Sequence, residues 1–172
     1  MKTGTAILLM VLAAACSGGG GGQPPLTTII VVRHAERATQ AQDTPLSPAG
    51  AARANELAHV LAGVKLSVIY VTQFLRTQQT AEPTASAEGM QLTVFKTGSG
   101  YPRALVHEIL TKHSGETVLV VTHGDTIAAI LGELGVQHAP IPASEYDDLF
   151  VCSVYGKPPA QLLPLRYGAP AR

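Results

Sequence analysis

The chain has 172 residues, of which 46% are hydrophobic, and its 12 basic and 12 acidic side chains give a formal net charge of zero. This balance argues against a general affinity for nucleic acid or for anionic lipid. The length suits one domain with a core of ordinary size. Cys16 and Cys152 are the only cysteines, and two cysteines cannot form a disulfide framework or a zinc-finger site.

The N-terminal residues have the pattern of a secretory signal. Lys2 precedes an apolar run at 5–15, which is shorter than the ~20 residues that a membrane-spanning helix needs. The run ends in Leu-Ala-Ala-Ala-Cys16, which resembles the lipobox of bacterial lipoproteins, although Ala13 stands where leucine is more common. The resemblance implies that Cys16 is acylated and becomes the mature N-terminus. The alternatives are an ordinary signal peptide on a secreted protein and a buried helix of a cytosolic one.

We therefore divide the chain into a signal peptide at 1–16, a flexible Gly/Pro tether at 17–25 and a domain at 26–172. Three apolar stretches of that domain lack polar alternation, as is typical of parallel strands buried on both faces. These predicted strands are 27–32, 66–71 and 117–122, and further strands are predicted at 92–95, 149–154 and 161–166. Helices are predicted at 48–62, at 74–88 with an interruption at Pro83, at 103–113 and at 125–134.

The first predicted helix has clear boundary signals. Ser47 suits the N-cap and Pro48 the first helical position, and Leu57, Val60 and Leu61 are expected on its inner face. The alternation of strands and helices predicts an α/β fold of three layers, with helices on both faces of a doubly wound, mostly parallel sheet. Cys152 is expected to be a small buried hydrophobe in a strand.

Charged side chains and histidines follow the predicted strands. Arg33 and His34 follow the first strand, His123 follows the strand at 117–122, and Arg76 lies just beyond the strand at 66–71. In open α/β sheets the carboxyl ends of the strands form the ligand-binding edge. Arginine matches phosphate oxygens with its planar fork, and a neutral histidine can attack phosphorus. This combination predicts an oxyanion pocket with a histidine nucleophile.

Four motifs carry a resemblance to a known family. They are Arg-His-x-Glu at 33–36, Leu-Ser-x-x-Gly at 46–50, Arg-x-x-Gln-Thr-Ala at 76–81 and His-Gly at 123–124. In this order they resemble the histidine phosphatase superfamily, in its phosphoglycerate mutase-like branch, over residues 29–134. The resemblance implies that His34 is the nucleophile and forms a phosphohistidine. It implies that Arg33, Arg76 and His123 hold the phosphoryl group, and it implies no metal or other cofactor.

The expected function is therefore hydrolysis of a small phosphomonoester or a phosphohistidine. The lipobox places this activity on a lipid anchor outside the cytoplasm, in the bacterial cell envelope. One alternative is a phosphate-binding lipoprotein that has lost turnover, and another is a phosphomutase. The chain is too short for the insertions that mutases of this superfamily use to retain a phosphorylated intermediate, so hydrolysis is preferred. The sequence carries no sign of the substrate's identity or the oligomeric state.

The sequence departs from the family at the proton donor. Many members use a glutamate that follows the Arg-x-x-Gln-Thr-Ala helix, whereas Glu108 is the only acidic residue between Gly89 and Gly115 and falls inside a predicted helix. Glu108, Asp125 and water are the alternatives.

Two further interpretations concern the residues next to His34. Glu36 and Arg37 either help to position the pocket or are merely paired at its rim. A zinc site of His34, Glu36 and His123 is disfavoured because Arg33 and Arg76 would repel the metal, and the Pro-Cys-x-x-Cys partner of zinc deaminases is absent from the sequence.

Overall fold

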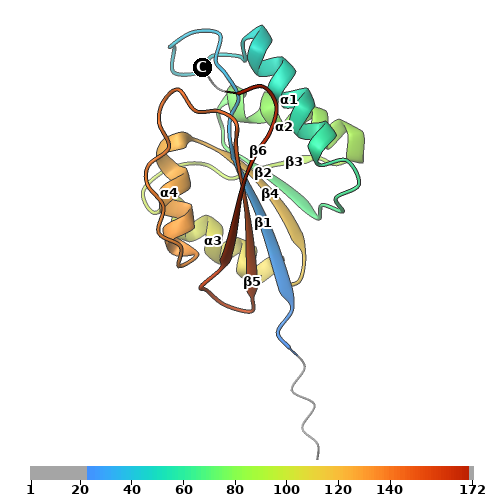
Figure 1. The fold of residues 1–172 in the computed structure, drawn as a ribbon, viewed down its shortest axis with the longest axis vertical. Helices are drawn as coiled ribbons and strands as arrows, with labels where there is room; N and C mark the ends of the chain where they lie inside the picture. The colour runs from blue at the N-terminus through green and yellow to red at the C-terminus, as the bar shows by residue number, and fades with distance from the viewer. Residues whose placement is uncertain (1–22, 171–172) are drawn as a thin grey trace, which may run out of the picture.

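The computed structural model describes residues 23–170. The predicted signal peptide, Cys16 and the first part of the tether lie outside these residues. The strands are β1 (Leu26–Arg33), β2 (Val68–Val71), β3 (Leu92–Val94), β4 (Thr117–Thr122), β5 (Asp148–Tyr155) and β6 (Gln161–Arg166). The helices are α1 (Pro48–Val60), α2 (Leu75–Glu88), α3 (Tyr101–Lys112) and α4 (Gly124–Glu133) (Figure 1).

The six strands form one sheet in the order β3-β2-β4-β1-β5-β6. The pairs β2–β3, β2–β4 and β1–β4 are parallel, whereas β5 is antiparallel to β1 and β6 is antiparallel to β5. The predicted α/β fold with a mostly parallel sheet is therefore confirmed, and its antiparallel part is confined to the two closing strands.

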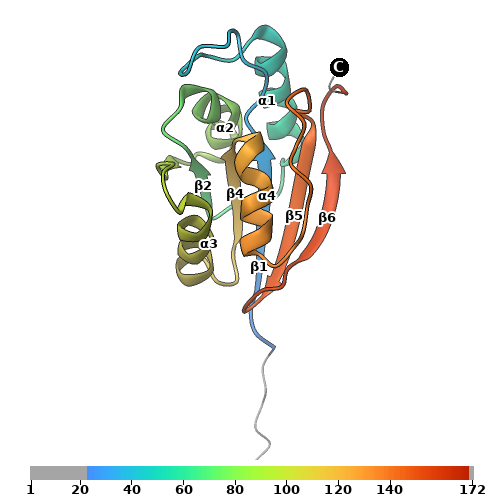
Figure 2. The same cartoon turned by 90° about the vertical axis from the view of Figure 1, so that its left-hand side faces the viewer.

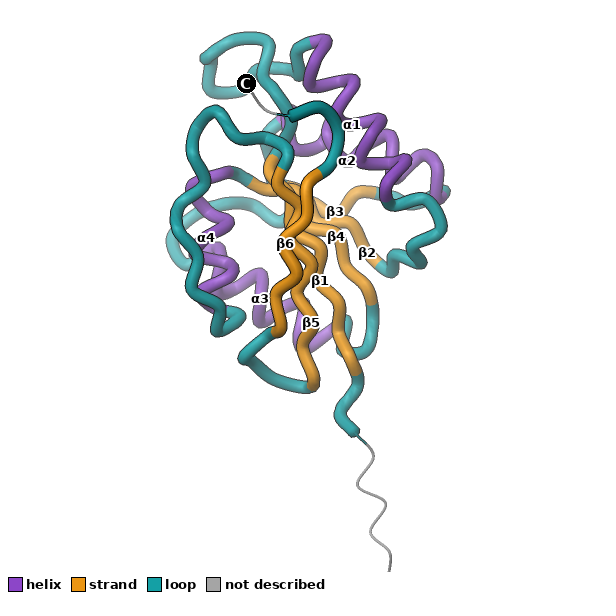
Figure 3. Tube along the Cα trace, viewed as in Figure 1, coloured by secondary structure: helices purple, strands orange, loops and turns teal. Residues whose placement is uncertain are grey.

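The helices form two layers around this sheet (Figure 2). Leu57 of α1 and Ala81 of α2 are fully buried against one face, in the same apolar cluster as Ile69 of β2. Leu105 of α3 and Ile127 of α4 are fully buried against the other face. Figure 3 shows the resulting order of helix, strand and helix, with loops collected above the carboxyl ends of the parallel strands.

Several predicted boundaries need correction. The helix α2 continues through Pro83 without a break, and the strand β2 begins at Val68 rather than at residue 66. The helix α3 begins two residues earlier than predicted, at Tyr101. Val60 was expected on the inner face of α1 but is 46% exposed, because the buried stripe is formed by Leu57 and Leu61, four residues apart, and Val60 lies to one side of it.

Other local predictions are confirmed. The side chain of Ser47 caps α1 by accepting a hydrogen bond from the Gly50 N–H at 3.1 Å, and Pro48 is the first helical residue. Cys152 is a fully buried free cysteine in β5. Among the described residues no helix has the length and apolar character that crossing a bilayer requires.

Candidate active site

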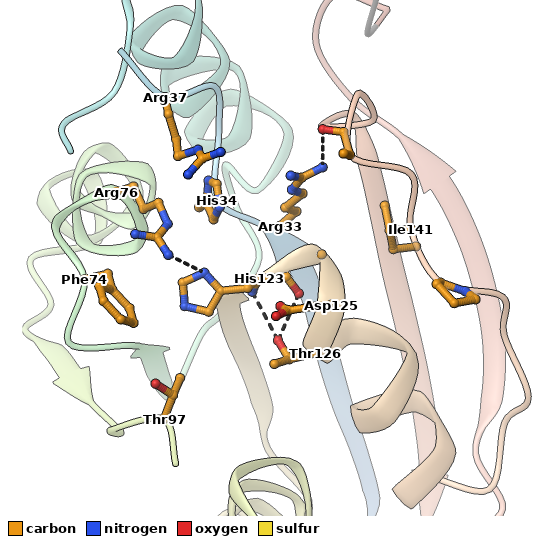
Figure 4. Close-up of a pocket in the computed structure, with 13 residues that line it drawn as sticks. Arg33, His34, Arg37, Phe74, Arg76, Thr97, His123, Asp125, Thr126 and Ile141 are labelled. Carbon is orange, nitrogen blue, oxygen red and sulfur yellow. Dashed lines mark hydrogen bonds between the residues drawn. The ribbon is translucent and has the colours of Figure 1, made fainter. Parts of the chain in front are cut away.

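The parallel pairing of β1 with β4 brings the two histidines together. The register places Arg33 opposite Thr122, and the backbone N–H of His34 donates to the Thr122 carbonyl at 2.8 Å, one residue beyond β1. The next residue of each strand then enters the same space, so that the rings of His34 and His123 lie 5.4 Å apart between centroids (Figure 4). The predicted meeting of strand ends therefore occurs at this edge of the sheet.

A pocket of about 560 Å³ opens at this edge. Three arginines and both histidines line it, together with one carboxylate and a wall of small and apolar groups. The lining residues are Arg33, His34, Arg37, Phe74, Arg76, Thr97, His123, Gly124, Asp125, Thr126, Pro140, Ile141 and Ala143. The excess of fixed positive charge suits an oxyanion with two or three negative charges.

His34 is held in one tautomer by the backbone of the next residue. Its Nδ1 lies 2.8 Å from the Ala35 carbonyl oxygen, which can only accept, so Nδ1 carries the proton and Nε2 keeps its lone pair. The residue is 4% exposed, and this burial, with the nearby positive groups, lowers the pKa of His34 to about 3 although the hydrogen bond to Ala35 raises it. A neutral imidazole with a free Nε2 is the nucleophilic form.

His123 is held in the opposite tautomer. Arg76 Nη2 lies 3.3 Å from His123 Nδ1 and can only donate, so Nδ1 accepts and Nε2 donates to the hydroxyl of Thr72 at 3.1 Å. Burial, and then the charge of Arg76, lower the pKa of His123 to about 4. His123 is therefore a neutral ring whose Nδ1 faces the pocket arginine.

Arg33 joins the pocket floor to the loop between α4 and β5. Its Nη1 donates to the carbonyls of Pro142, Ala143 and Glu145 at 2.8–3.0 Å, and its guanidinium carbon lies 4.0 Å from the centre of the Tyr146 ring. These bonds occupy Nη1, while Nε is buried without a hydrogen-bond partner in the described residues. Nη2 and Nε are thus the donors that remain for an anion.

Arg76 and Arg37 complete the positive side of the pocket. Arg76 donates from Nη1 to the Gln42 carbonyl at 2.7 Å and stacks on the Phe74 ring at 4.4 Å, which fixes the direction of its guanidinium. Arg37 also lines the pocket and hydrogen-bonds to Gln40. Its Nε, like that of Arg76, is buried without a hydrogen-bond partner among residues 23–170. Arg37 is therefore one of the residues that line the pocket.

Comparison with known families matches residues 29–97 to the histidine phosphatase superfamily, branch 1. This match covers less than half of the chain. The matched segment contains His34, Arg33 and Arg76 together with three of the four motifs noted in the sequence. Comparison with curated protein sequences gives no match.

Solved structures resemble the chain over most of its length. The protein histidine phosphatase SixA in complex with tungstate is 18% identical, with a TM-score of 0.65, and the match covers 81% of this chain and 96% of that one. Mycobacterial glucosyl-3-phosphoglycerate phosphatase is 17% identical, with a TM-score of 0.68 and coverage of 84% and 100%. A phosphoserine phosphatase variant from Entamoeba histolytica with phosphoserine is 17% identical, with a TM-score of 0.59 and coverage of 82% and 96%. At these identities the likeness establishes the fold.

The motifs noted in the sequence have structural reasons in this chain. Gly50 is required because a Cβ there would lie 2.2 Å from the Glu36 carbonyl oxygen, so the first turn of α1 packs directly on the chain after His34. In α2, Gln79 accepts a hydrogen bond from the Leu46 N–H at 2.8 Å, and Thr80 accepts one from the Ala35 N–H at 2.9 Å. The motifs therefore hold the segment that follows His34 from two sides.

Glu108 is not brought to the pocket. It forms an ion pair with Lys112 at 2.9 Å on α3, one helical turn further along, and it does not line the cavity that contains His34. Asp125, in the first turn of α4, is the one carboxylate that lines this cavity. Of the two carboxylates considered from the sequence, the geometry thus favours Asp125.

Glu36 has a structural position behind the pocket. Its carboxylate accepts three hydrogen bonds from Arg53 at 2.7–3.1 Å, and Arg53 also donates to the Tyr167 carbonyl at 3.0 Å. Burial raises the pKa of Glu36, but the Arg53 bonds outweigh it, so that the net pKa is lowered. Within residues 23–170 no group of three His, Cys, Asp or Glu side chains is arranged to hold a metal ion.

Sequence reasoning missed the residues that enter the pocket from loops. Thr97 precedes α3, and Pro140, Ile141 and Ala143 lie between α4 and β5. None of these residues lies in a motif, and no local pattern links either loop to His34. Phe74 could have been found, because it lies two residues before Arg76 and its ring packs on that guanidinium.

Proposed function

We propose that this protein is a phosphohydrolase that transfers a phosphoryl group from a small phosphorylated substrate to His34 and then to water. The observation that carries the proposal is the state of His34. Its Nδ1–H is engaged by the Ala35 carbonyl, which leaves the Nε2 lone pair free in a pocket lined by three arginines. The superfamily match over residues 29–97 supports the same chemistry.

The first step forms a bond from Nε2 of His34 to phosphorus. The bond between phosphorus and the leaving group breaks, and the leaving atom departs with the electron pair and takes a proton from Asp125 or from water. Arg33, Arg37 and Arg76 neutralise the charge on the phosphoryl oxygens, as preorganised donors do in phosphoryl transfer. His123 lies beside Arg76 and keeps its guanidinium directed at the same space.

The second step is hydrolysis of the phosphohistidine. A water oxygen bonds to phosphorus, the phosphorus–nitrogen bond breaks, and its electron pair returns to Nε2. The proton of the water goes to Asp125 or to solvent, and inorganic phosphate leaves. The hydrogen bond from Nδ1 to Ala35 stabilises the positive charge that the ring carries in the intermediate.

Hydrolysis of p-nitrophenyl phosphate by the purified protein tests this proposal. We expect turnover by the wild-type protein and its loss in His34→Ala. His59→Ala is the matched control, since His59 is exposed on α1 outside the pocket, and it should keep wild-type activity. Wild-type protein that binds phosphate without turnover would instead favour the phosphate-binding alternative. Turnover that survives in His34→Ala would refute the nucleophile.

Two leaving groups distinguish the substrate classes. The resemblance to a protein histidine phosphatase and to phosphatases of small phosphate esters supports both a phosphohistidine and a phosphomonoester. A kcat/KM for a phosphohistidine peptide well above that for an alkyl phosphate would assign the first class, and the reverse order would assign the second.

We further propose that Cys16 attaches the protein to a membrane of the bacterial envelope. The support is the signal-like sequence at 1–16 and the glycine-rich stretch that follows it. The several acyl chains of a bacterial lipoprotein make such attachment stable, whereas one chain binds only marginally. Wild-type protein made in bacteria should partition into detergent, and Cys16→Ser should move it to the aqueous phase. A wild-type protein found wholly in the aqueous phase, with another N-terminal residue, would support plain secretion.

A further inference from the structure

One side of β1, β5 and β6 exposes large apolar side chains. Among residues 23–170, seven large hydrophobic side chains are exposed, and four of them lie here: Leu26 (41%), Tyr155 (46%), Leu163 (55%) and Leu165 (43%). Residues paired across neighbouring strands point to the same side of the sheet, and Leu26 is paired with Tyr155. Other residues on this side of β5 are paired with β6: Val151 with Leu163, and Leu149 with Leu165. We call the surface of Leu26, Thr28, Ser153, Tyr155, Leu163 and Leu165 the β5–β6 face.

The helices leave this face uncovered. It lies on the side of the sheet that α1 and α2 cover, but their apolar residues pack over β1, β2 and β4, where Ile30 and Val32 are buried. Figure 1 shows α1 and α2 over the upper part of that side, while α3 and α4 lie on the other side of the sheet. An apolar surface that continues over three strands differs from single exposed residues, which need no partner.

The face carries no charge. All residues of β1, β5 and β6 whose side chains point to this side are uncharged. Asp148 and Arg166 point to the other side of the sheet, where they form an ion pair at 3.2 Å. A partner that binds through salt bridges therefore finds no counter-charge within these strands. A lipid surface needs none, and a tyrosine at the border of an apolar patch is typical of membrane interfaces.

The described part of the chain begins beside this face. Leu26 begins β1 and belongs to the face, and nine residues, 17–25, separate it from Cys16. A chain of nine residues reaches ~30 Å at most, even when it is fully extended. An anchor at Cys16 would hold the face at a high effective concentration beside the bilayer, so that a weak apolar contact suffices.

A second copy of the chain fits the exposed edge of the sheet less well. Pro164 lies in β6, opposite Phe150, and a proline in an edge strand has its nitrogen on the free side. The edge therefore lacks a donor at that point, which opposes pairing of β6 with another strand. The exposed side chains remain available to a surface that needs no backbone pairing.

We propose that the β5–β6 face docks on the surface of the lipid bilayer to which the tether leads. This inference rests on the attachment at Cys16 proposed above. The face runs along the strands: Leu26 lies roughly 23 Å from Arg33 at ~3.3 Å per residue, whereas Leu165 is level with Leu149 and Val32, next to the pocket end of β1. The pocket then lies at the end of the strand that is farther from the anchor.

Tryptophan fluorescence tests the docking, because the chain contains no tryptophan. Leu163→Trp places a single probe on the β5–β6 face. Val94→Trp is the matched control, since Val94 is 48% exposed on β3, at the opposite edge of the sheet. The full-length variants are attached to phosphatidylcholine–phosphatidylglycerol vesicles that contain a brominated lipid. Cys152 is fully buried, so the Cys16 thiol of unacylated protein can be coupled to maleimide-bearing lipid.

We expect the emission of Trp at position 163 to shift to the blue and to be quenched several-fold more than that at position 94. Equal, weak quenching of both attached variants would overturn the docking while leaving the anchor intact. Equal, strong quenching would also overturn it, as non-specific adsorption. If the emission is shifted to the blue without lipid and the protein has the mass of a dimer, a second copy covers the face and the docking is overturned.

Coupling to the vesicles does not depend on acylation in the cell. Failure of the lipoprotein proposal is therefore seen separately, in the detergent-partition experiment. Wild-type p-nitrophenyl phosphate hydrolysis by both variants verifies that they fold.

Discussion

The side chain that protonates the leaving group must reach the pocket. Asp125 lines the cavity with His34, while Glu108 is paired with Lys112 on α3. Nitrophenolate leaves without a proton, whereas an alkoxide needs one, and general acid catalysis typically contributes ~10²–10⁴-fold.

We therefore predict that Asp125→Asn slows hydrolysis of an alkyl phosphate by about 10²-fold or more and hardly changes hydrolysis of p-nitrophenyl phosphate. Glu108→Gln is the matched control and should leave both rates unchanged. The comparison of kcat for the two substrates in each variant is the measurement. An equal loss on both substrates in Asp125→Asn would point to the charge balance of the pocket instead, and no loss on either would leave water as the donor.

The two neutral histidines predict how stability changes with pH. Burial lowers the pKa of His34 to about 3 and that of His123 to about 4, whereas histidines of the unfolded chain titrate near ~6.5. Between these values the unfolded state binds protons that the folded state does not, so the free energy of unfolding decreases as pH falls from about 7 towards 4.

Urea unfolding at pH 7 and pH 5 measures this dependence. The double variant His34→Gln, His123→Gln should lose less stability between the two pH values than the wild type does. His59→Gln with His107→Gln is the control, because both residues are exposed, and it should keep the wild-type dependence. The same pH dependence in all three proteins would show that the pocket histidines are not the groups responsible.

The residues of the site differed in how well they could be predicted. Arg33, His34, Arg76 and His123 lie next to strands or in short motifs, so their meeting followed from the parallel order of the strands. Ile141 and Thr97 could not be found this way, because their loops reach the pocket through tertiary packing that no local pattern encodes.

At the scale of elements, the contact of α1 with the segment after His34 is the tightest constraint. Gly50 lies in the first turn of α1, and a Cβ at that position would lie 2.2 Å from the backbone oxygen of Glu36. Backbone cannot move away as a side chain can, so Gly50→Ala must displace either α1 or the His34 segment.

We predict that Gly50→Ala lowers both the free energy of unfolding and the activity. Gly132→Ala is the matched control on α4, because nothing lies within 4 Å of its added Cβ. In a helix, alanine is favoured over glycine by about 0.5–1 kcal/mol, so this variant should be as stable as the wild type or more stable. Denaturation curves and rates of p-nitrophenyl phosphate hydrolysis of the two variants test this prediction. A Gly50→Ala protein with the stability and activity of the wild type would disprove the contact.

Element boundaries were less predictable than element types. Pro83 suggested a break, but α2 continues through it, because packing of Ala81 and Ala85 in the core holds both sides of the proline. Val60 fitted the apolar period of α1, but Leu57 and Leu61 fill the contact with the sheet and Val60 stays exposed. In both cases tertiary packing outweighed the local signal.

For the whole molecule, the alternation of strands and helices predicted the fold class but not the direction of the last two strands. β5 is antiparallel to β1 because the loop at 134–147 carries the chain from the end of α4 back to the pocket edge before β5 begins, and β6 is antiparallel to β5 because a short connection at 156–160 joins them. This arrangement leaves β6 as an edge with one uncovered face. It also places the tether at one end of β1 and the pocket at the other.

The central claim is that phosphoryl transfer passes through His34, and direct detection of the phosphorylated protein tests it best. Phosphohistidine is lost in acid and survives in alkali, so substrate labelled with radioactive phosphate should label the protein after an alkaline quench but not after an acid quench. Peptide mapping by mass spectrometry should place the phosphate on His34, and His34→Ala should remain unlabelled. Label that survives acid, lies on another residue or persists in His34→Ala would contradict the account.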